Sequence, residues 1–426
     1  MESPAPSAAS ASVVTLRKSR RGRYRCVSHA SLKNNLLAGV GYLELANAGD
    51  FAANVWNEIP VPRHAMILMA IGGPIALSVS LVAARDYYLS WQNVKILLSE
   101  RKALNVSPCP DKTTEGVLGV NFRELGTELI DRMFMDLLLG IGALLVGTGT
   151  IMAIWGANRR VFEASNLMSG FIGNGFAAFF GLVNAVWSAY LVYRFQVRYS
   201  ACLANPAIAP IRMRVLQRYR RLQWHSAING FNGLVAGMAS MVTARMWWGY
   251  VVLIPCVMAM IAGNLFWRRK LGYNRPIKLD LCHDVLEDEK PQEHDACCDI
   301  LDTMTSTTVA QHTLPGIVRT AGVNVLLAFI VLNQLFESFC VWVSREWPDH
   351  RAFNPPEKTL HISHYDLLGG PGEDQARMAA ECRRFLSKVG STLLEHRQRY
   401  LLELAGEVAW KEQTERNTNA NSNDSL

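Results

Sequence analysis

The first two thirds of the chain alternate between long apolar runs and short polar segments. Five runs contain no Asp, Glu, Lys or Arg, and they cover residues 65–84, 137–158, 167–193, 226–244 and 246–267. A helix rises about 1.5 Å per residue, so roughly 20 apolar residues cross the ~30 Å hydrocarbon core of a bilayer. The pattern predicts an all-α fold, a polytopic transmembrane helical bundle with five spans.

A sixth apolar stretch covers residues 323–343. Residues 325–332 in its first half are fully apolar, whereas Asn333, Gln334 and Glu337 interrupt the second half. It is either a sixth span that turns its polar face into the bundle or a helix that lies at the membrane interface.

The same pattern divides the chain into seven segments. A partly disordered N-terminal tail covers residues 1–63, the five-span bundle 64–267, an acidic loop with Cys and His residues 268–315, the sixth stretch 316–345, a Pro/Gly-rich linker 346–372, an amphipathic helix 373–410, and a disordered tail 411–426. Met378, Cys382 and Phe385 recur at helical spacing in the amphipathic segment. Residues 1–12 lack an apolar core, so we expect no cleaved signal peptide.

The net charge of +7 comes from Lys and Arg residues that cluster beside the apolar runs. Loop one (residues 85–133), loop three (194–225) and the segment after the fifth run hold seven, seven and five of them. The positive-inside rule places these segments in the cytosol of a plasma membrane or endomembrane protein, and nucleic acid is not an expected partner. The basic cluster between Arg17 and Arg25 is a basic tail or, alternatively, part of a mitochondrial transit peptide.

Small residues recur every four positions in the third run. They form a ridge of Ser169, Gly173, Ala177, Gly181, Ala185 and Ala189, and the fourth run repeats the device with Gly233 and Gly237. Such residues let membrane helices approach closely, so the ridge predicts packing within the bundle or, alternatively, a homo-oligomer interface. Several partner helices lie in the same chain, and this favours packing within the bundle.

Four asparagines lie inside the apolar runs, namely Asn174, Asn184, Asn229 and Asn232. Each can form a hydrogen bond between helices, which is worth only ~0.6 kcal/mol in membranes. Alternatively, they line a path for an uncharged polar solute. The sequence favours packing.

Residues 211–224 have the pattern of a basic amphipathic helix. Ile211, Val215, Tyr219 and Leu222 make an apolar stripe, and Arg214, Arg218 and Arg221 share another face. The three arginines are candidates for binding anionic lipid head groups, or they set orientation alone.

The acidic loop contains five residues with metal-binding atoms: Cys282, His283, His294, Cys297 and Cys298. Their spacing is not that of paired zinc ligands, so we predict no metal site. The chain also lacks nucleophile-elbow, P-loop, zinc-protease and dinucleotide fingerprints. We therefore expect no cofactor and no enzymatic activity.

The layout resembles that of fungal integral membrane proteins of unassigned function. The resemblance covers most of the chain and is carried by residues 61–66 (VPRHAM), 85–91 (RDYYLSW) and 267–270 (WRRK). It implies a membrane location and no particular activity. Two functions remain open: a non-enzymatic protein that organises lipid or protein partners, and a carrier or channel for a neutral or lipophilic solute. A polar cavity bordered by the asparagines would favour the second.

Overall fold

A computed structural model of the whole chain describes residues 13–18, 24–26, 30–32, 50–56, 59–106, 112–277, 296–353, 359–369 and 372–423. The described chain is helical almost throughout and forms two compact units. Unit 1 comprises Met1–Leu32, Tyr273–Glu293 and Cys298–Leu401, and unit 2 comprises Lys33–Gly272, His294–Cys297 and Leu402–Leu426.

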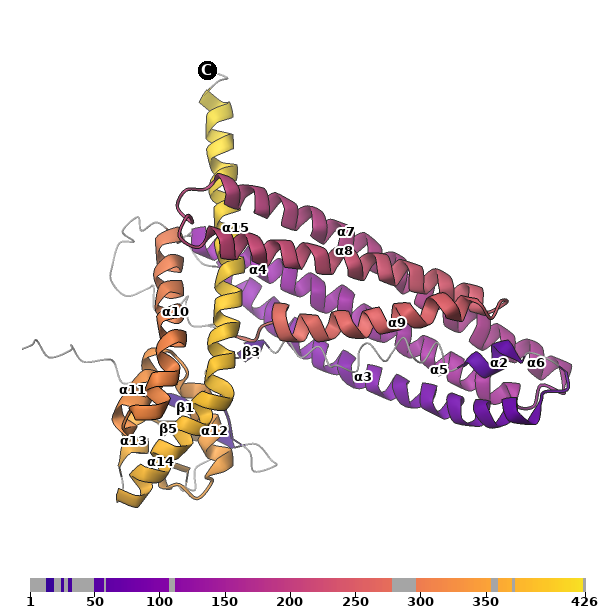
Figure 1. Cartoon of the computed structure of the whole chain (residues 1–426), viewed down its shortest axis with the longest axis horizontal. Coiled ribbons are helices and arrows are strands. Elements are labelled where there is room, and N and C mark those ends of the chain that lie inside the picture. The colour runs from indigo at the N-terminus through magenta and orange to yellow at the C-terminus, as the bar shows by residue number, and fades with distance from the viewer. Residues whose placement is uncertain are drawn as a thin grey trace, which may run out of the picture. The chain divides into compact units, whose positions relative to one another are not determined.

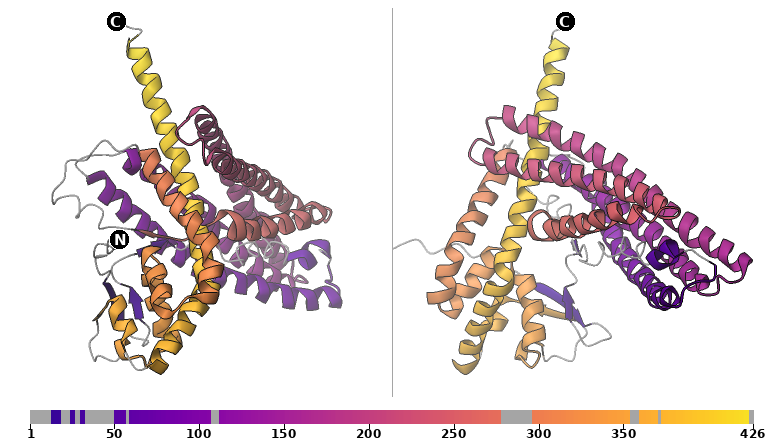
Figure 2. Two further views of the ribbon diagram at one scale, coloured as in Figure 1. Left: turned by 60° about the vertical axis from the view of Figure 1, so that its left-hand side comes forward. Right: turned by 45° about the vertical axis from the view of Figure 1, so that its right-hand side comes forward.

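Unit 2 is built from long helices and short π-helical segments (η). In chain order they are α2 (Phe51–Val55), α3 (Arg63–Val106), α4 (Lys112–Gly126), η3 (Thr127–Phe134), α5 (Met135–Ala153), α6 (Arg159–Ser165), η4 (Asn166–Gly173), α7 (Asn174–Ala204), α8 (Arg212–Thr243), α9 (Gly249–Phe266) and η5 (Trp267–Leu271). The helices α3, α5, α7, α8 and α9 run alongside one another (Figures 1 and 2).

Four helical stretches are long and apolar enough to cross a membrane: Arg63–Val106, Lys112–Ala153, Arg159–Ala204 and Gly249–Leu271. The helix α8, which carries the fourth apolar run, is not among them. At 1.5 Å per residue α3 is roughly 66 Å long, twice the thickness of a hydrocarbon core. Its second half is the polar segment predicted as part of loop one. Loops one and three are therefore largely helical, and we call residues 85–106, 112–136, 194–204 and 212–225 the polar continuations of the long helices.

Large apolar side chains cover the outside of unit 2 along the apolar runs. Ile67, Leu81, Val186, Phe231 and Val251 are all exposed. The interior between the same helices is filled by small residues; for example, a Cβ at Gly147 would lie 2.9 Å from the Gly73 carbonyl oxygen. An exposed apolar surface over small-residue contacts is typical of helices that face lipid.

Unit 1 combines small sheets with short helices. Strands β1 (Val14–Lys18), β2 (Tyr24–Cys26) and β5 (Thr359–Ile362) form one antiparallel sheet in the order β2-β1-β5, and β3 (Ala30–Leu32) pairs with β4 (Arg275–Ile277). The helical elements are α10 (Ala296–Thr320), α11 (Val323–Leu332), α12 (Phe336–Glu346), the 3-10 helix η8 (Arg351–Phe353), α13 (His364–Leu368), α14 (Gly372–Phe385), η9 (Leu386–Gly390) and α15 (Ser391–Asn423). Two of these helices are shared, because the first two residues of α10 and the part of α15 from Leu402 belong to unit 2.

The core of unit 1 corrects the prediction for the N-terminal tail. Val14 and Leu16 alternate with outward-facing residues in β1, and Leu16 pairs with Leu360 of β5. Both side chains are buried in one core with Phe339 and Phe385. Residues 14–18 therefore form an ordered strand, contrary to the predicted disorder. The sequence did not reveal the strand because its partner, β5, is more than 300 residues away along the chain. Strand β5 and helix α13 likewise occupy the segment predicted as a linker.

Two further predictions about the C-terminal third were wrong. The sixth stretch is not one long helix, because α11 ends at Leu332 and Gln334 adopts a positive φ of 54° before α12 begins. A ten-residue helix of this kind spans only ~15 Å, half of a hydrocarbon core. The predicted disordered tail after residue 410 is also helical, since α15 continues to Asn423.

Candidate functional site

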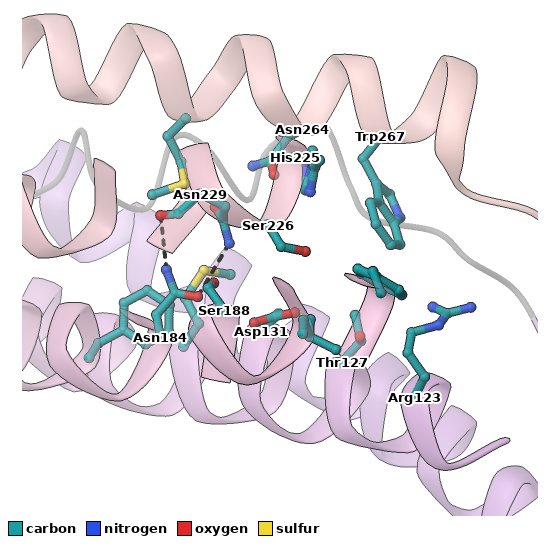
Figure 3. Close-up of a pocket in the computed structure, with 15 residues that line it drawn as sticks. Arg123, Thr127, Asp131, Asn184, Ser188, His225, Ser226, Asn229, Asn264 and Trp267 are labelled. Atoms are coloured by element: carbon teal, nitrogen blue, oxygen red, sulfur yellow. Dashed lines mark hydrogen bonds between the residues drawn. The ribbon is translucent and has the colours of Figure 1, made fainter. Parts of the chain in front are cut away.

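A cavity of about 40 Å³, lined by both apolar and polar side chains, lies in unit 2 among η3, α7, α8 and α9 (Figure 3). Its polar lining residues are Arg123, Thr127, Asp131, Asn184, Ser188, His225, Ser226, Asn229 and Asn264, and Trp267 closes one side. Since a water molecule needs roughly 10–15 Å³ on this measure, the cavity has room for a few waters. It reaches from the apolar runs into the polar continuations.

Asn184 and Asn229, two of the asparagines inside the apolar runs, meet at this cavity. Asn184 Nδ2 donates to the backbone oxygen of Asn229 at 3.2 Å, and Asn229 Nδ2 donates to Asn184 Oδ1 at 3.2 Å (Figure 3). Gly233 makes room for this pair, because a Cβ there would lie 2.6 Å from Asn184 Nδ2. The two hydrogen bonds join α7 to α8 at the cavity wall.

Three polar atoms at the cavity have no hydrogen-bond partner among the described residues. They are the hydroxyl oxygen of Thr127, Oδ1 of Asp131 and Nδ2 of Asn264, and all three atoms are buried. Buried polar groups are normally satisfied by protein or by ordered water. Their donors and acceptors are therefore available to a small polar molecule in the cavity.

The other two asparagines lie outside the cavity lining. Asn174 Nδ2 donates to Thr243 Oγ1 at 3.4 Å, and Asn232 Nδ2 donates to the Cys256 backbone oxygen at 3.0 Å. These contacts join α7 to α8 and α8 to α9. The four asparagines thus divide into two that line the cavity and two that connect helices elsewhere.

The small-residue ridge contacts two different helices. Ser169 and Gly173 face α5, where Gly149 and Gly142 lie opposite, whereas Gly181 faces Gly233 and Gly237 of α8. Ala177 is buried, Ala185 is half-buried, and Ala189 is exposed. Four residues turn a helix by roughly 400°, so a four-residue ridge drifts by about 40° at each step and winds from one neighbour to the next.

The basic face predicted on α8 is divided in the structure. Its apolar stripe is buried, and so is Arg218, which donates to the Leu271 backbone oxygen at 2.7 Å and to Glu403 Oε2 at 3.4 Å. Arg218 is thus used inside unit 2, while Arg214 and Arg221 are exposed. The sequence pattern predicted one shared surface for the three arginines. It could not reveal that Arg218 is buried, because its acceptors, Leu271 and Glu403, come from other parts of the chain.

Two glutamates of α15 are central to the packing of the polar continuations. Arg123 Nε lies 2.6 Å from Glu403 Oε1, and Arg194 Nη2 lies 2.7 Å from Glu407 Oε1, with Arg198 Nε at 3.3 Å. Burial alone would raise the pKa of Glu403, but Arg123 and Arg218 hold it below its ordinary value. Sequence reasoning missed these sites, although two carboxylates four residues apart inside the apolar segment 401–409 were a visible signal.

A second group of buried charges joins α3 to η3 and α5. Arg132 Nη2 donates to Asp86 Oδ1 at 2.9 Å, and Arg132 Nη1 donates to Glu128 Oε2 at 2.9 Å. Ser90 Oγ and Asn93 Nδ2 also donate to Glu128. Asp136 lies one turn beyond Arg132. Asp86 follows the first apolar run, and Glu128, Arg132 and Asp136 precede the second, so an analysis of charge-free segments alone could not reveal this group.

One buried carboxylate lies outside the long helices. Asp50, which precedes α2, accepts hydrogen bonds from Tyr250 Oη at 2.7 Å and Asn54 Nδ2 at 2.8 Å. Burial raises the pKa of Asp50 to about 6, in spite of these hydrogen bonds. This carboxyl group is the acceptor that ties α2 to α9.

Three of the five Cys and His residues of the acidic loop, Cys282, His283 and His294, lie outside the described residues. Cys297 is buried with its sulfur 3.3 Å from Glu412 Oε1, and Cys298 is exposed. Within the described ranges no group of three or more His, Cys, Asp or Glu residues is arranged to hold a metal ion.

None of the protein-family models, curated proteins or solved structures compared with the chain matches it. The geometry defines the class at a coarse level. This is a helical protein with four helices long and apolar enough to cross a membrane, and it carries a small cavity of mixed lining among its long helices.

Proposed function

We propose that unit 2 is a five-span membrane bundle in which α8 also crosses the bilayer. On α8 the apolar side chains of Ile228, Phe231 and Met238 are exposed, whereas Asn229 and Asn232 form hydrogen bonds with neighbouring helices. The asparagines lower its mean hydropathy without presenting polar groups to lipid. A buried polar face and an exposed apolar face fit a helix surrounded by lipid.

Exposed aromatic residues support the same placement. Trp155, Trp247 and Trp248 lie at one end of the apolar runs, and Tyr88 and Trp224 lie at the other. Trp and Tyr are enriched at both membrane interfaces, where an apolar ring meets water. In this arrangement the polar continuations extend into the cytosol.

We further propose that the bundle is a carrier or channel for a small, uncharged polar solute. The observation that carries the proposal is the cavity, with buried donors and acceptors from Thr127, Asn184, Asn229 and Asn264. Apolar helix packing does not require such a lining, because buried polar groups without partners cost about 1–3 kcal/mol each. The mixture of amide and hydroxyl groups with the carboxyl group of Asp131 suits a solute that both donates and accepts hydrogen bonds.

The experiment is a flux assay with the purified full chain in liposomes. Light scattering after an osmotic jump reports the entry of water, glycerol or urea, and we expect at least one of them to enter faster than in protein-free liposomes. Asn264→Leu should abolish the difference, since it replaces unpaired cavity amide atoms by methyl groups. Because Asn264 Nδ2 has no partner to lose, the variant should remain as stable as wild type.

Thr148→Ala provides the matched control. The Thr148 hydroxyl bonds only within its own helix, to the Leu144 backbone oxygen at 2.8 Å, and Thr148 does not line the cavity. This variant should retain wild-type flux. Wild-type rates equal to those of empty liposomes for all three solutes, or full flux in Asn264→Leu, would refute the proposal.

A second candidate function is the organisation of anionic lipid around the bundle. Arg214 and Arg221 are exposed on α8 near the exposed ring of Trp224. Each basic residue near an anionic leaflet contributes about 1 kcal/mol to binding. If this function is correct, anionic lipid should raise the melting temperature of the full chain more than neutral lipid does, and Arg214→Gln with Arg221→Gln should remove the difference. Arg159→Gln, on the opposite side of the membrane, should not.

A further inference from the structure

The carboxyl groups of Asp86 and Asp136 face each other in the buried charge cluster of unit 2. Asp136 is 3% exposed, and neither of its carboxylate oxygens has a hydrogen-bond donor among the described residues. Asp86 is 1% exposed, and its Oδ2 also lacks a donor there. The two side chains lie within hydrogen-bonding reach of each other. Two carboxylates cannot form a hydrogen bond unless one of them carries a proton.

The neighbouring charges do not remove this requirement. The charged groups that act on Asp136 are Asp86 from α3 together with Glu128 and Arg132 from η3. The guanidinium group of Arg132 is already engaged by Asp86 Oδ1 and by both oxygens of Glu128. Three carboxylates therefore share one guanidinium in a site closed to water. Three buried carboxyl groups that share a single positive charge cannot all be ionised unless a further cation binds.

We propose that Asp86 and Asp136 form a proton-binding site in which the Asp136 hydroxyl donates to Asp86 Oδ2. One proton accounts for two of the three oxygens that lack a donor, namely the Asp136 oxygen that carries it and Asp86 Oδ2, which accepts it. A metal ion would have to sit beside the guanidinium of Arg132, which repels cations, and carboxylate-bound cations such as Ca²⁺ require six or more oxygen ligands. The proton needs neither space nor further ligands.

The site lies beside the solute cavity and is independent of it. Thr127, Asp131 and Met135 line the cavity, whereas Glu128, Arg132 and Asp136, each one residue further along, face α3. The proton site would therefore stand if the cavity carried no solute.

Infrared spectroscopy of the purified full chain tests the proposal, because a protonated carboxyl group has a C=O stretch distinct from that of a carboxylate. At neutral pH wild type should show a carboxylic acid band, and Asp136→Asn should lose it. Glu163→Gln is the control, since Glu163 forms an exposed pair with Arg159 and should leave the band unchanged.

Melting temperatures at neutral pH give a second measurement. Asp136→Asn should melt at or above the wild-type temperature, because an amide donates the same hydrogen bond as the protonated acid, while Asp136→Ala should melt lower. If Asp136→Asn does not fold, the band should instead be lost or shifted in Asp86→Asn. A wild-type spectrum without the band would overturn the proposal. So would stabilisation by Na⁺, K⁺ or Ca²⁺ that Asp136→Asn abolishes, because that result assigns the site to a metal cation.

Discussion

The contact between α7 and α8 predicts the effect of adding a single methyl group at Gly181. A Cβ there would lie closer to the Gly233 backbone oxygen than Cβ atoms ever do, and 3.6 Å from Gly237 Cα. Neither neighbour is a side chain that could rotate away. Gly181→Ala must therefore push the two helices apart.

The magnitude follows from three contributions. Overpacking against backbone costs typically 1–3 kcal/mol. The separation also weakens the two Asn184–Asn229 hydrogen bonds one turn away, at ~0.6 kcal/mol each. Against these stands the helix propensity of Ala, which exceeds that of Gly by about 1 kcal/mol. Gly175→Ala cancels the last contribution, because Gly175 lies in the same helix and a Cβ there meets nothing within 4 Å.

We expect Gly181→Ala to be about 2–4 kcal/mol less stable than Gly175→Ala. The assay is reversible unfolding of the purified chain in mixed micelles, with the free energy of unfolding compared between the two variants. Gly237→Ala should behave like Gly181→Ala, since its Cβ would lie 2.8 Å from Ala178 Cα. If Gly181→Ala is as stable as Gly175→Ala, the close approach of α7 and α8 is wrong.

Three further predictions concern charge and topology. The pKa of Asp50 is raised from 3.8 to about 6, so the folded state binds the proton more tightly than the unfolded chain does. Stability should therefore fall by about 2 kcal/mol as pH rises from 4 to 6. Asp50→Asn should lack this fall, and parallel pH–melting curves for wild type and variant would contradict the assignment. Glu407→Gln should lower the free energy of unfolding by about 3–5 kcal/mol, because it leaves Arg194 and Arg198 buried without their carboxylate. The control Glu163→Gln breaks an exposed pair of 3.0 Å and should change the free energy of unfolding by less than about 1 kcal/mol. Equal losses in the two variants would show that burial is not the cause. Asn105 is an exposed glycosylation acceptor in the last turn of α3. It should carry no glycan if loop one is cytosolic. An endoglycosidase-sensitive glycan at Asn105 would invert the proposed topology.

The asparagines of the apolar runs illustrate the limits of sequence patterns. Periodicity located all four inside apolar runs but treated them alike. Only the rotation of α7 against α8 decides that Asn184 and Asn229 meet at the cavity, while Asn174 and Asn232 bond elsewhere. The π-helical segment η4, just before α7, changes the helical register, and residue spacing alone did not reveal it.

The sequence by itself determined where the long apolar helices lie and which small residues could support close contacts. These properties are local, because length, composition and helical period are contained in about 20 consecutive residues. The tertiary structure decided which charges meet. Arg194 and Glu407 are 213 residues apart, and Asp86 and Arg132 are 46 apart. The strand pairing of β1 with β5 was equally hidden. Such contacts depend on how the helices and strands pack together, and a pattern read along one segment carries no information about the opposite partner.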